Sequence, residues 1–354
     1  MSTRFAHLVG SVNLPDAEST FTTVTEHLGH RMHRIPDGEV GDRYYWIQFQ
    51  KDFFDETPGL SRLGDDAILL RDRFDARPIV LDGSVPAEDL HLPGLGYADA
   101  AIESYATFAA LKAEGRVPSD VRFQVSLPTP AGVIGSFFHA DHRAAVEPVY
   151  EQGLFAELDR ILDAIPHDQL AIQWDTALEF GMLEKAQLRG YEITSWFGNT
   201  HEEILMGVLE RAVRQASRVP QDVELGYHLC YGDFEEHHFV QPADAGVLAG
   251  VLTGLFTGSP RPVTWVHLPV PIERDDDAYF APLASVQWPA GTEVYLGLLH
   301  YGDGVEGALR RASTASKFVA DYGVATECGF GRGPSERTAT LLDLHEQVAA
   351  ALAL

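Results

Sequence analysis

Three residues of this chain have types and spacing that suit a metal site. His228 and Cys230, in the segment GYHLCYGDFEEHHF (226–239), stand two positions apart at the end of an apolar run typical of a buried strand. Alternate side chains of a strand leave the same face, so this pair can converge on one point. Cys328, the only other cysteine, also follows an apolar run. Thiolate and imidazole together are zinc ligands, and we expect zinc here; two buried, unreactive cysteines are the alternative.

Other polar residues also stand where apolar runs end. They are Gly10, Ser11, Asp175, His267 and His300. In a barrel of parallel strands all carboxyl ends ring one mouth, and that mouth is the catalytic face. Residues a hundred positions apart can therefore share one site.

The elements that position these residues alternate along the chain. Short apolar runs of strand length are followed by segments with helical spacing. The predicted strands are 5–11, 77–83, 121–130, 169–181, 223–233, 262–271, 293–303 and 323–333, and the predicted helices include 144–165, 200–219, 303–323 and 334–354. Thr200, three residues before Glu203, is typical of a helix start.

This alternation predicts the fold class. Near-continuously apolar strands between helices indicate a parallel sheet covered on both faces. Eight such strands close a (β/α)8 TIM barrel, so we expect an α/β protein with a single barrel domain over 1–354 and an elaborated N-terminal region. An open, doubly wound sheet is the alternative.

Composition narrows the classes of partner. The 354 residues carry 26 basic and 52 acidic side chains, a formal net charge of -26. Such a chain repels nucleic acid and anionic membranes, whose binding depends on Lys and Arg. It contains no apolar stretch long enough to span a membrane, and its start lacks a signal-peptide core, so we expect a cytoplasmic protein. Two cysteines do not make a disulfide framework.

Five segments together resemble a known family, the C-terminal catalytic barrel of cobalamin-independent methionine synthase, which includes epoxyalkane:coenzyme M transferase-like proteins. YHLCYGDF (227–234) resembles its zinc-binding His-x-Cys strand, and ATECGFGRG (325–333) its closing cysteine segment. LVGSVNLP (8–15), PDGEVGDRYYWIQF (36–49) and IQWDTA (172–177) are similar to its Ile-Gly-Ser turn, its His-Gly-Glu segment and its Ile-Asp-Glu-Pro-Ala strand end.

The resemblance implies a zinc-dependent transferase that methylates or otherwise alkylates a small thiol. It implies zinc ligation by His228, Cys230 and Cys328, and it places His267 where the family has a ligating glutamate. The implied substrate pocket is Gly10, Ser11, Glu39, Arg43 and Asp175, and the implied catalytic residues are Asp175 and His300. The implied partners are a small-molecule thiol and an alkyl donor.

Several alternatives remain open at this point. His267 is either a zinc ligand or a histidine hydrogen-bonded within the rim; in the second case Glu235, Glu236 or Glu273 could supply the ligand. His237 and His238 are expected to be loop or helix-cap residues rather than ligands. The function could also be an epoxide-opening thiol transferase, a metal-free decarboxylase-like barrel, or a non-catalytic zinc- or thiol-binding barrel.

Overall fold

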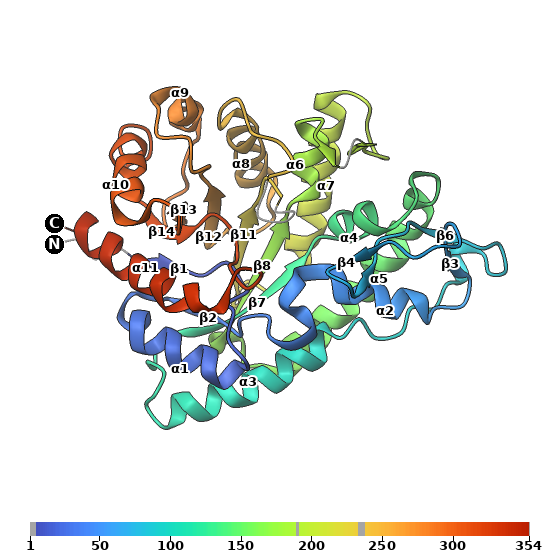
Figure 1. The fold of residues 1–354 in the computed structure, drawn as a ribbon, viewed down its shortest axis with the longest axis horizontal. Helices are drawn as coiled ribbons and strands as arrows, with labels where there is room; N and C mark the ends of the chain where they lie inside the picture. Colours follow the sequence, from blue (N-terminus) through green and yellow to red (C-terminus); the bar gives the residue numbers. More distant parts are fainter. Residues whose placement is uncertain (1–4, 189–190, 233–237, 354) are drawn as a thin grey trace.

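The computed structural model describes residues 5–188, 191–232 and 238–353 and shows a (β/α)8 barrel (Figure 1). Its eight parallel strands run in the order β1-β14-β13-β12-β11-β8-β7-β2. The strands are β1 (Ala6–His7), β2 (Arg34–Pro36), β7 (Arg122–Pro128), β8 (Leu170–Thr176), β11 (Glu224–Leu229), β12 (Trp265–Pro269), β13 (Glu293–Leu299) and β14 (Gly323–Thr326). A parallel bridge between Ser11 and Gly38, just beyond β1 and β2, closes the ring.

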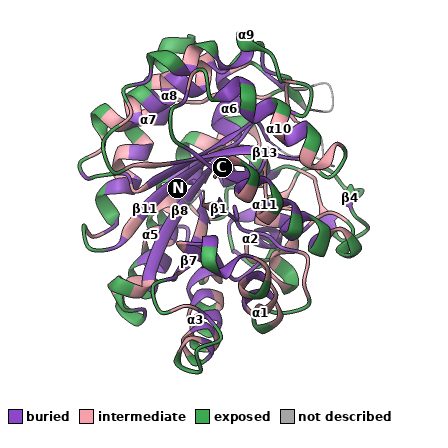
Figure 2. Cartoon of the chain, turned by 90° about the vertical axis from the view of Figure 1, so that its left-hand side faces the viewer, coloured by how far each residue is buried: buried purple, intermediate pink, exposed green. Residues whose placement is uncertain are grey.

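Helices follow the strands and cover the outside of the barrel. The main ones are α1 (Ala17–Leu28), α3 (Tyr97–Ala113), α5 (Ala140–Ala164), α7 (His201–Arg218), α8 (Gly246–Gly258), α10 (Gly304–Ala315) and α11 (Thr338–Leu352). Their inner faces are buried and their outer faces exposed, around strands that are buried almost throughout (Figure 2). The predicted start of α7 is confirmed, because Thr200 and Glu203 form a capping box.

One predicted strand forms but does not belong to the barrel, so its assignment to the barrel is wrong. The segment 77–83 forms β6 (Ile79–Leu81), which pairs antiparallel with β3 (Leu60–Arg62) outside the barrel. The second barrel strand is instead β2, whose inward residue Arg34 is buried and forms ion pairs with Glu224 and Glu293. A charged residue in a three-residue strand breaks the apolar pattern by which the other strands are found.

The elaboration predicted near the N-terminus lies between β2 and α3. It comprises η2 (Gly41–Phe49), α2 (Gln50–Asp55), β3, β4 (Leu69–Leu70), β5 (Phe74–Asp75), β6 and η3 (Ala87–Asp89), and its hairpins project to one side of the barrel (Figure 1). The remaining short elements are η1 (Gly29–Arg31), α4 (Pro130–Phe137), η4 (His167–Gln169), α6 (Leu178–Leu183), β9 (Gln187–Leu188), β10 (Tyr191–Glu192), α9 (Asp277–Phe280), η5 (Ala281–Ser285) and η6 (Ser335–Arg337).

Strand register brings chemistry to one level of the barrel. His228 on β11 is level with Asp175 on β8 and with His267 on β12. Below this level Trp265 fills the interior, and Gly226 leaves room for it: a Cβ on Gly226 would lie 1.9 Å from the indole. The packed interior therefore supports three polar residues at the carboxyl end.

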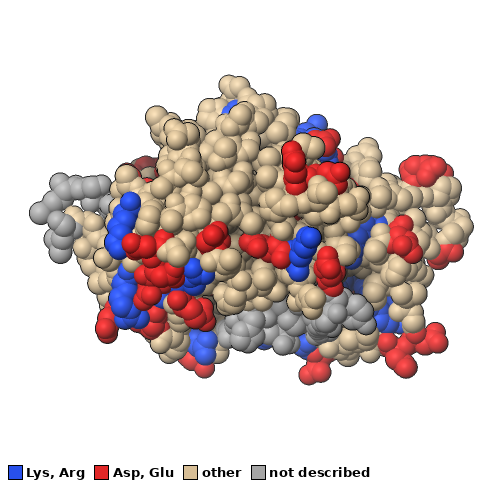
Figure 3. Space-filling view, turned by 90° about the horizontal axis from the view of Figure 1, so that it is seen from above, with Lys and Arg blue, Asp and Glu red and all other residues tan. Residues whose placement is uncertain are grey.

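Charged side chains of both signs are dispersed over the surface. Acidic side chains are scattered among basic ones on the face shown in Figure 3. No helix in the described part of the chain is long and apolar enough to cross a membrane.

Candidate metal centre

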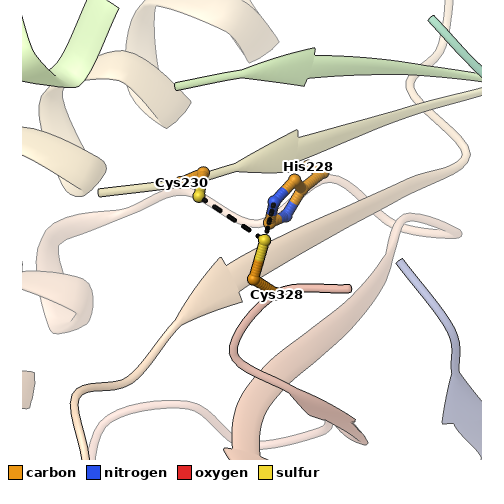
Figure 4. A group of neighbouring side chains, drawn as sticks. All are labelled: His228, Cys230 and Cys328. Atoms are coloured by element: carbon orange, nitrogen blue, oxygen red, sulfur yellow. Dashed lines mark hydrogen bonds between the residues drawn. The ribbon is translucent and has the colours of Figure 1, made fainter. Parts of the chain in front are cut away.

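His228, Cys230 and Cys328 come together at the carboxyl end of the barrel (Figure 4). Their ligand atoms all lie within 4.8 Å of one another. Cys328 Sγ is 4.0 Å from Cys230 Sγ and 3.8 Å from His228 Nε2. Around a tetrahedral zinc the corresponding spacings are about 3.8 Å and about 3.5 Å, given Zn–S of about 2.3 Å and Zn–N of about 2.0 Å. The three side chains therefore fit this ion in both donor type and separation.

The loop that carries Cys328 is tied to the segment that follows the first strand of the barrel. Ser11 accepts two backbone hydrogen bonds from it, from Phe330 N to the carbonyl and from Gly331 N to Oγ. Gly329 allows this close approach, since a Cβ there would lie 2.4 Å from Ser11 Oγ. The structure thus gives Ser11 a role in placing Cys328.

His267 stands beside His228, and both of its ring nitrogens are hydrogen-bonded. Its Nδ1 is 2.7 Å from His228 Nδ1, and its Nε2 is 2.9 Å from the carbonyl oxygen of Thr326. Burial lowers the pKa of His267 to about 4 and lowers the pKa of His228 well below its usual value. This is the rim hydrogen bonding considered above as the alternative to ligation.

A small cavity of about 50 Å³ lies beside the candidate metal group, which is His228, Cys230 and Cys328. The predicted pocket residues Gly10, Ser11, Glu39 and Asp175 line it together with His228, Cys230 and Cys328. Its two carboxyl groups are electrostatically coupled. Burial raises the pKa of Glu39 to about 7, and burial together with the negative charge of Glu39 raises the pKa of Asp175 well above its usual range. Both acids gain from a cation placed between them.

Backbone geometry brings Glu39 to this cavity. Glu39 has a φ of 50° and follows Gly38 at 84°. Its carboxyl group lies against Gly10, where a Cβ would be 2.7 Å from Glu39 Oε1. A glycine at position 10 is therefore a requirement for this placement of Glu39.

Arg43, also predicted to bind substrate, does not line the small cavity. Its guanidinium donates to both carboxylate oxygens of Asp37, at 3.3 and 2.6 Å. Burial alone would raise the pKa of Asp37, but the Arg43 guanidinium holds that pKa below its usual value. Asp37 in turn accepts from the backbone N–H of Glu39 at 2.9 Å. Arg43 thus supports the turn that carries Glu39.

Gln173, which the sequence reasoning missed, orients Asp175 from inside the barrel. Its Nε2 donates to Asp175 Oδ1 at 2.9 Å and to the carbonyl of Val9 at 2.6 Å. Its Oε1 accepts from His7 and Trp265. The sequence could have indicated this residue, because Gln173 is two residues before Asp175 on the same strand and so shares its face.

A larger cavity of about 360 Å³ opens on the other side of the two cysteines. His300 lines it, as do His238 and Glu327. Glu327 Oε1 is 2.8 Å from His238 Nε2, and its Oε2 is 3.9 Å from His300 Nδ1. His300 Nε2 donates to the carbonyl of Val270 at 2.8 Å, and burial lowers the pKa of His300. His238, expected to be an ordinary loop residue, is thus part of a carboxylate–histidine group in this cavity.

Arg332 lines both cavities. Its NH2 group is 3.4 Å from Cys328 Sγ. A guanidinium at this distance favours the thiolate form of a cysteine. Nothing in the sequence pattern singled out Arg332, because its position depends on the loop after β14.

The carboxylates considered as substitutes for His267 lie in different places. Glu273 lines the larger cavity. Glu235 and Glu236, with His237, lie outside the described residues.

The structure is therefore a (β/α)8 barrel with a His/Cys/Cys group at the carboxyl ends of its strands. The chain is similar to the solved structure of a B12-independent methionine synthase from Shewanella sp. W3-18-1 in complex with selenomethionine. The match covers 100% of this chain and 98% of the chain of that synthase, with a TM-score of 0.61 and 15% sequence identity. The structure of a putative vitamin-B12 independent methionine synthase from Listeria monocytogenes matches 99% of this chain and 98% of its own, with a TM-score of 0.56 and 14% identity. No protein-family model and no curated protein matches the sequence.

The chain therefore has the fold of these B12-independent methionine synthase structures. This likeness confirms the barrel that the sequence resemblance implied.

Proposed function

We propose that this protein is a zinc-dependent transferase that moves a methyl or other alkyl group to the sulfur of a small thiol. The observation that carries the proposal is the position of His228, Cys230 and Cys328: they form a zinc-compatible donor set, and both cysteines line the two cavities on either side. Such an arrangement suits a reaction that joins two molecules at one sulfur atom. The shared fold with B12-independent methionine synthase structures supports it.

Zinc bound at this group would hold a substrate thiol in its deprotonated, nucleophilic form at neutral pH. Two cysteine thiolates and a neutral imidazole cancel the charge of the ion. A substrate thiolate then adds one negative charge, which the Arg332 guanidinium beside Cys328 offsets.

In this proposal the small cavity holds the thiol substrate. Glu39 and Asp175 both have raised pKa values, so an ammonium group of the substrate restores their ionised forms and is bound in return. Gln173 fixes the direction of Asp175, and the Asp37–Arg43 pair fixes the turn of Glu39. These contacts favour an amino-thiol over an uncharged thiol.

The larger cavity is then the place of the alkyl donor. As the sulfur–carbon bond forms, the bond from that carbon to its leaving atom breaks, and the leaving atom takes up a proton. We assign this proton to the protonated form of His300, which the neighbouring Glu327 carboxylate favours.

The test combines metal analysis with a reaction screen. We expect the purified protein to hold about one zinc per chain. Amino-thiols and uncharged thiols are incubated with methyl and epoxide donors, and mass spectrometry reads the alkylated product, with Cys328→Ser as the matched inactive control. Protein that neither contains nor takes up zinc contradicts the proposal. So does zinc-loaded protein that forms no more product than the control.

A further inference from the structure

His267 faces His228 across two neighbouring strands. β11 and β12 hold the two residues in register, and their Nδ1 atoms are 2.7 Å apart. Both side chains are buried, and His267 is completely inaccessible to solvent. A nitrogen–nitrogen contact this short requires one hydrogen between the two atoms.

Thr326 decides which nitrogen carries that hydrogen. The Thr326 carbonyl can only accept, so His267 Nε2, at 2.9 Å, is the donor of that hydrogen bond. An uncharged His267 then has a lone pair on Nδ1. His228 Nδ1 must donate to it, which leaves the lone pair of His228 on Nε2.

This tautomer matches the metal group. Nε2 is the atom of His228 that faces Cys328 Sγ, at 3.8 Å. Resting on the function proposed above, we propose that His267 is a positioning residue that presents His228 Nε2 to the metal, and that His267 is not itself a ligand. Thr326 is two residues before Cys328. Its carbonyl thus orients His267, which in turn orients the His228 nitrogen that faces the metal group.

The number of protein ligands determines how the substrate reaches the zinc. The described residues then supply three ligand atoms, from His228, Cys230 and Cys328, rather than four. A zinc site with three protein ligands keeps one position for a substrate atom. The thiol can bind without displacing a side chain, whereas a second imidazole acting as a fourth protein ligand would have to be displaced.

Two variants separate positioning from ligation and from a general packing role. The amide of Asn places its polar atoms where His has Nδ1, whereas the amide of Gln places them where His has Nε2. His267→Asn therefore keeps the acceptor for His228, and His267→Gln keeps only the contact to Thr326. We expect zinc affinity, measured by competition with a chelator, to stay close to wild type in His267→Asn and to fall about 10- to 100-fold in His267→Gln, the usual effect of losing a partner of a metal-bound histidine.

His345→Asn is the matched control, since His345 is another fully buried histidine, bonded through Nδ1 to the Leu341 carbonyl of its own helix. It reports the effect of shrinking a buried histidine and should leave zinc affinity unchanged. X-ray absorption of the zinc-loaded wild type gives a second readout, with one imidazole and two sulfurs expected.

The inference is overturned by two imidazoles in that spectrum, by equal loss of zinc in both His267 variants, or by wild-type affinity in His267→Gln. Each of these outcomes leaves the proposed transferase standing, because the wild type still binds zinc. Wild-type protein without zinc overturns both.

Discussion

The sulfur atoms of Cys230 and Cys328 lie 4.0 Å apart, although 98 positions separate the two residues along the chain. Cys230 follows β11, and Cys328 follows β14, with β12 and β13 between them in the barrel wall. The closure of the barrel brings the two strand ends to one mouth. A metal held there would link elements that the fold already brings together.

Replacing either cysteine should remove zinc without unfolding the barrel. In Cys230→Ser and Cys328→Ser we expect zinc to be lost, because serine is a far weaker zinc ligand than thiolate. Far-UV circular dichroism should stay at the wild-type signal, since both residues lie on the catalytic rim rather than at the opposite face. A chelator should lower the melting temperature of the wild type, which zinc stabilises by binding only the folded state, and leave both variants unchanged.

Ser217→Ala, on the exposed side of α7, is the surface control and should behave as wild type. Variants that unfold while still retaining zinc would show that the cysteines serve packing alone.

Much of the fold follows from the sequence pattern. Seven of the eight barrel strands are apolar runs followed by helical segments, and these are found by periodicity. β2 is not, because Arg34 occupies its inward position and is compensated by Glu224 and Glu293, which are distant in sequence. β6 has the expected apolar composition but pairs with β3 outside the barrel.

The site is predictable only where strands carry it. The period of two places His228 and Cys230 on one face, and barrel closure brings Cys328 to them. Arg332 and His238 lie on loops, whose paths no periodicity predicts. The contacts of His267 also depend on a tertiary detail, the direction of the Thr326 carbonyl.

His300 should matter for the chemical step and not for binding. His300→Gln can keep the hydrogen bond to the Val270 carbonyl through its amide, but it cannot exchange a proton. The rate of alkyl transfer to the thiol should fall by about 10²-fold or more, the usual contribution of a general acid, while zinc and thiol affinities stay the same. Single-turnover kinetics on the zinc-loaded protein measures this.

His167→Gln is the matched control, because His167 lies before β8, at the opposite end of the barrel, and pairs with Asp222. If His300→Gln turns over at the wild-type rate, the leaving atom takes its proton from another donor.

Adding a methyl group at position 10 should disturb the small cavity alone. In Gly10→Ala the new Cβ meets the carboxyl group of Glu39 at 2.7 Å, so Glu39 must move. We expect affinity for an amino-thiol to fall about 10- to 100-fold, because hydrogen bonds to charged groups contribute about 1.5–3 kcal/mol. Isothermal titration calorimetry measures this loss.

Gly153→Ala on α5 tests whether any added methyl has this effect, since its nearest neighbours are 3.6 Å away. Zinc content should remain that of the wild type in both variants. Loss of zinc in Gly10→Ala would show that this position supports the metal group rather than Glu39.

The raised pKa of Glu39 predicts a pH-dependent substrate affinity. Below about pH 7 Glu39 is protonated and cannot pair with an ammonium group, so affinity should rise with pH and level off above that value. The probe is the S-methyl thioether of an amino-thiol, whose sulfur does not titrate, so the pH step reports the protein. In Glu39→Gln affinity should be lower at pH 8, and the step near pH 7 should disappear.

The raised pKa of Glu39 also determines whether its contribution to the free energy of unfolding rises or falls with pH. The pKa of Glu39 in the folded protein, about 7, lies above its ordinary value of 4.5, so folding favours the protonated form. Its contribution to the free energy of unfolding is therefore complete below pH 4.5 and is lost as the pH rises to about 7. Glu39→Gln should be more stable than wild type at pH 8, and this advantage should shrink at pH 5, as measured by urea unfolding. A wild-type affinity that is flat across pH 5–8, together with equal unfolding curves for the two proteins, would mean that Glu39 titrates at its ordinary pKa and does not bind the amino group.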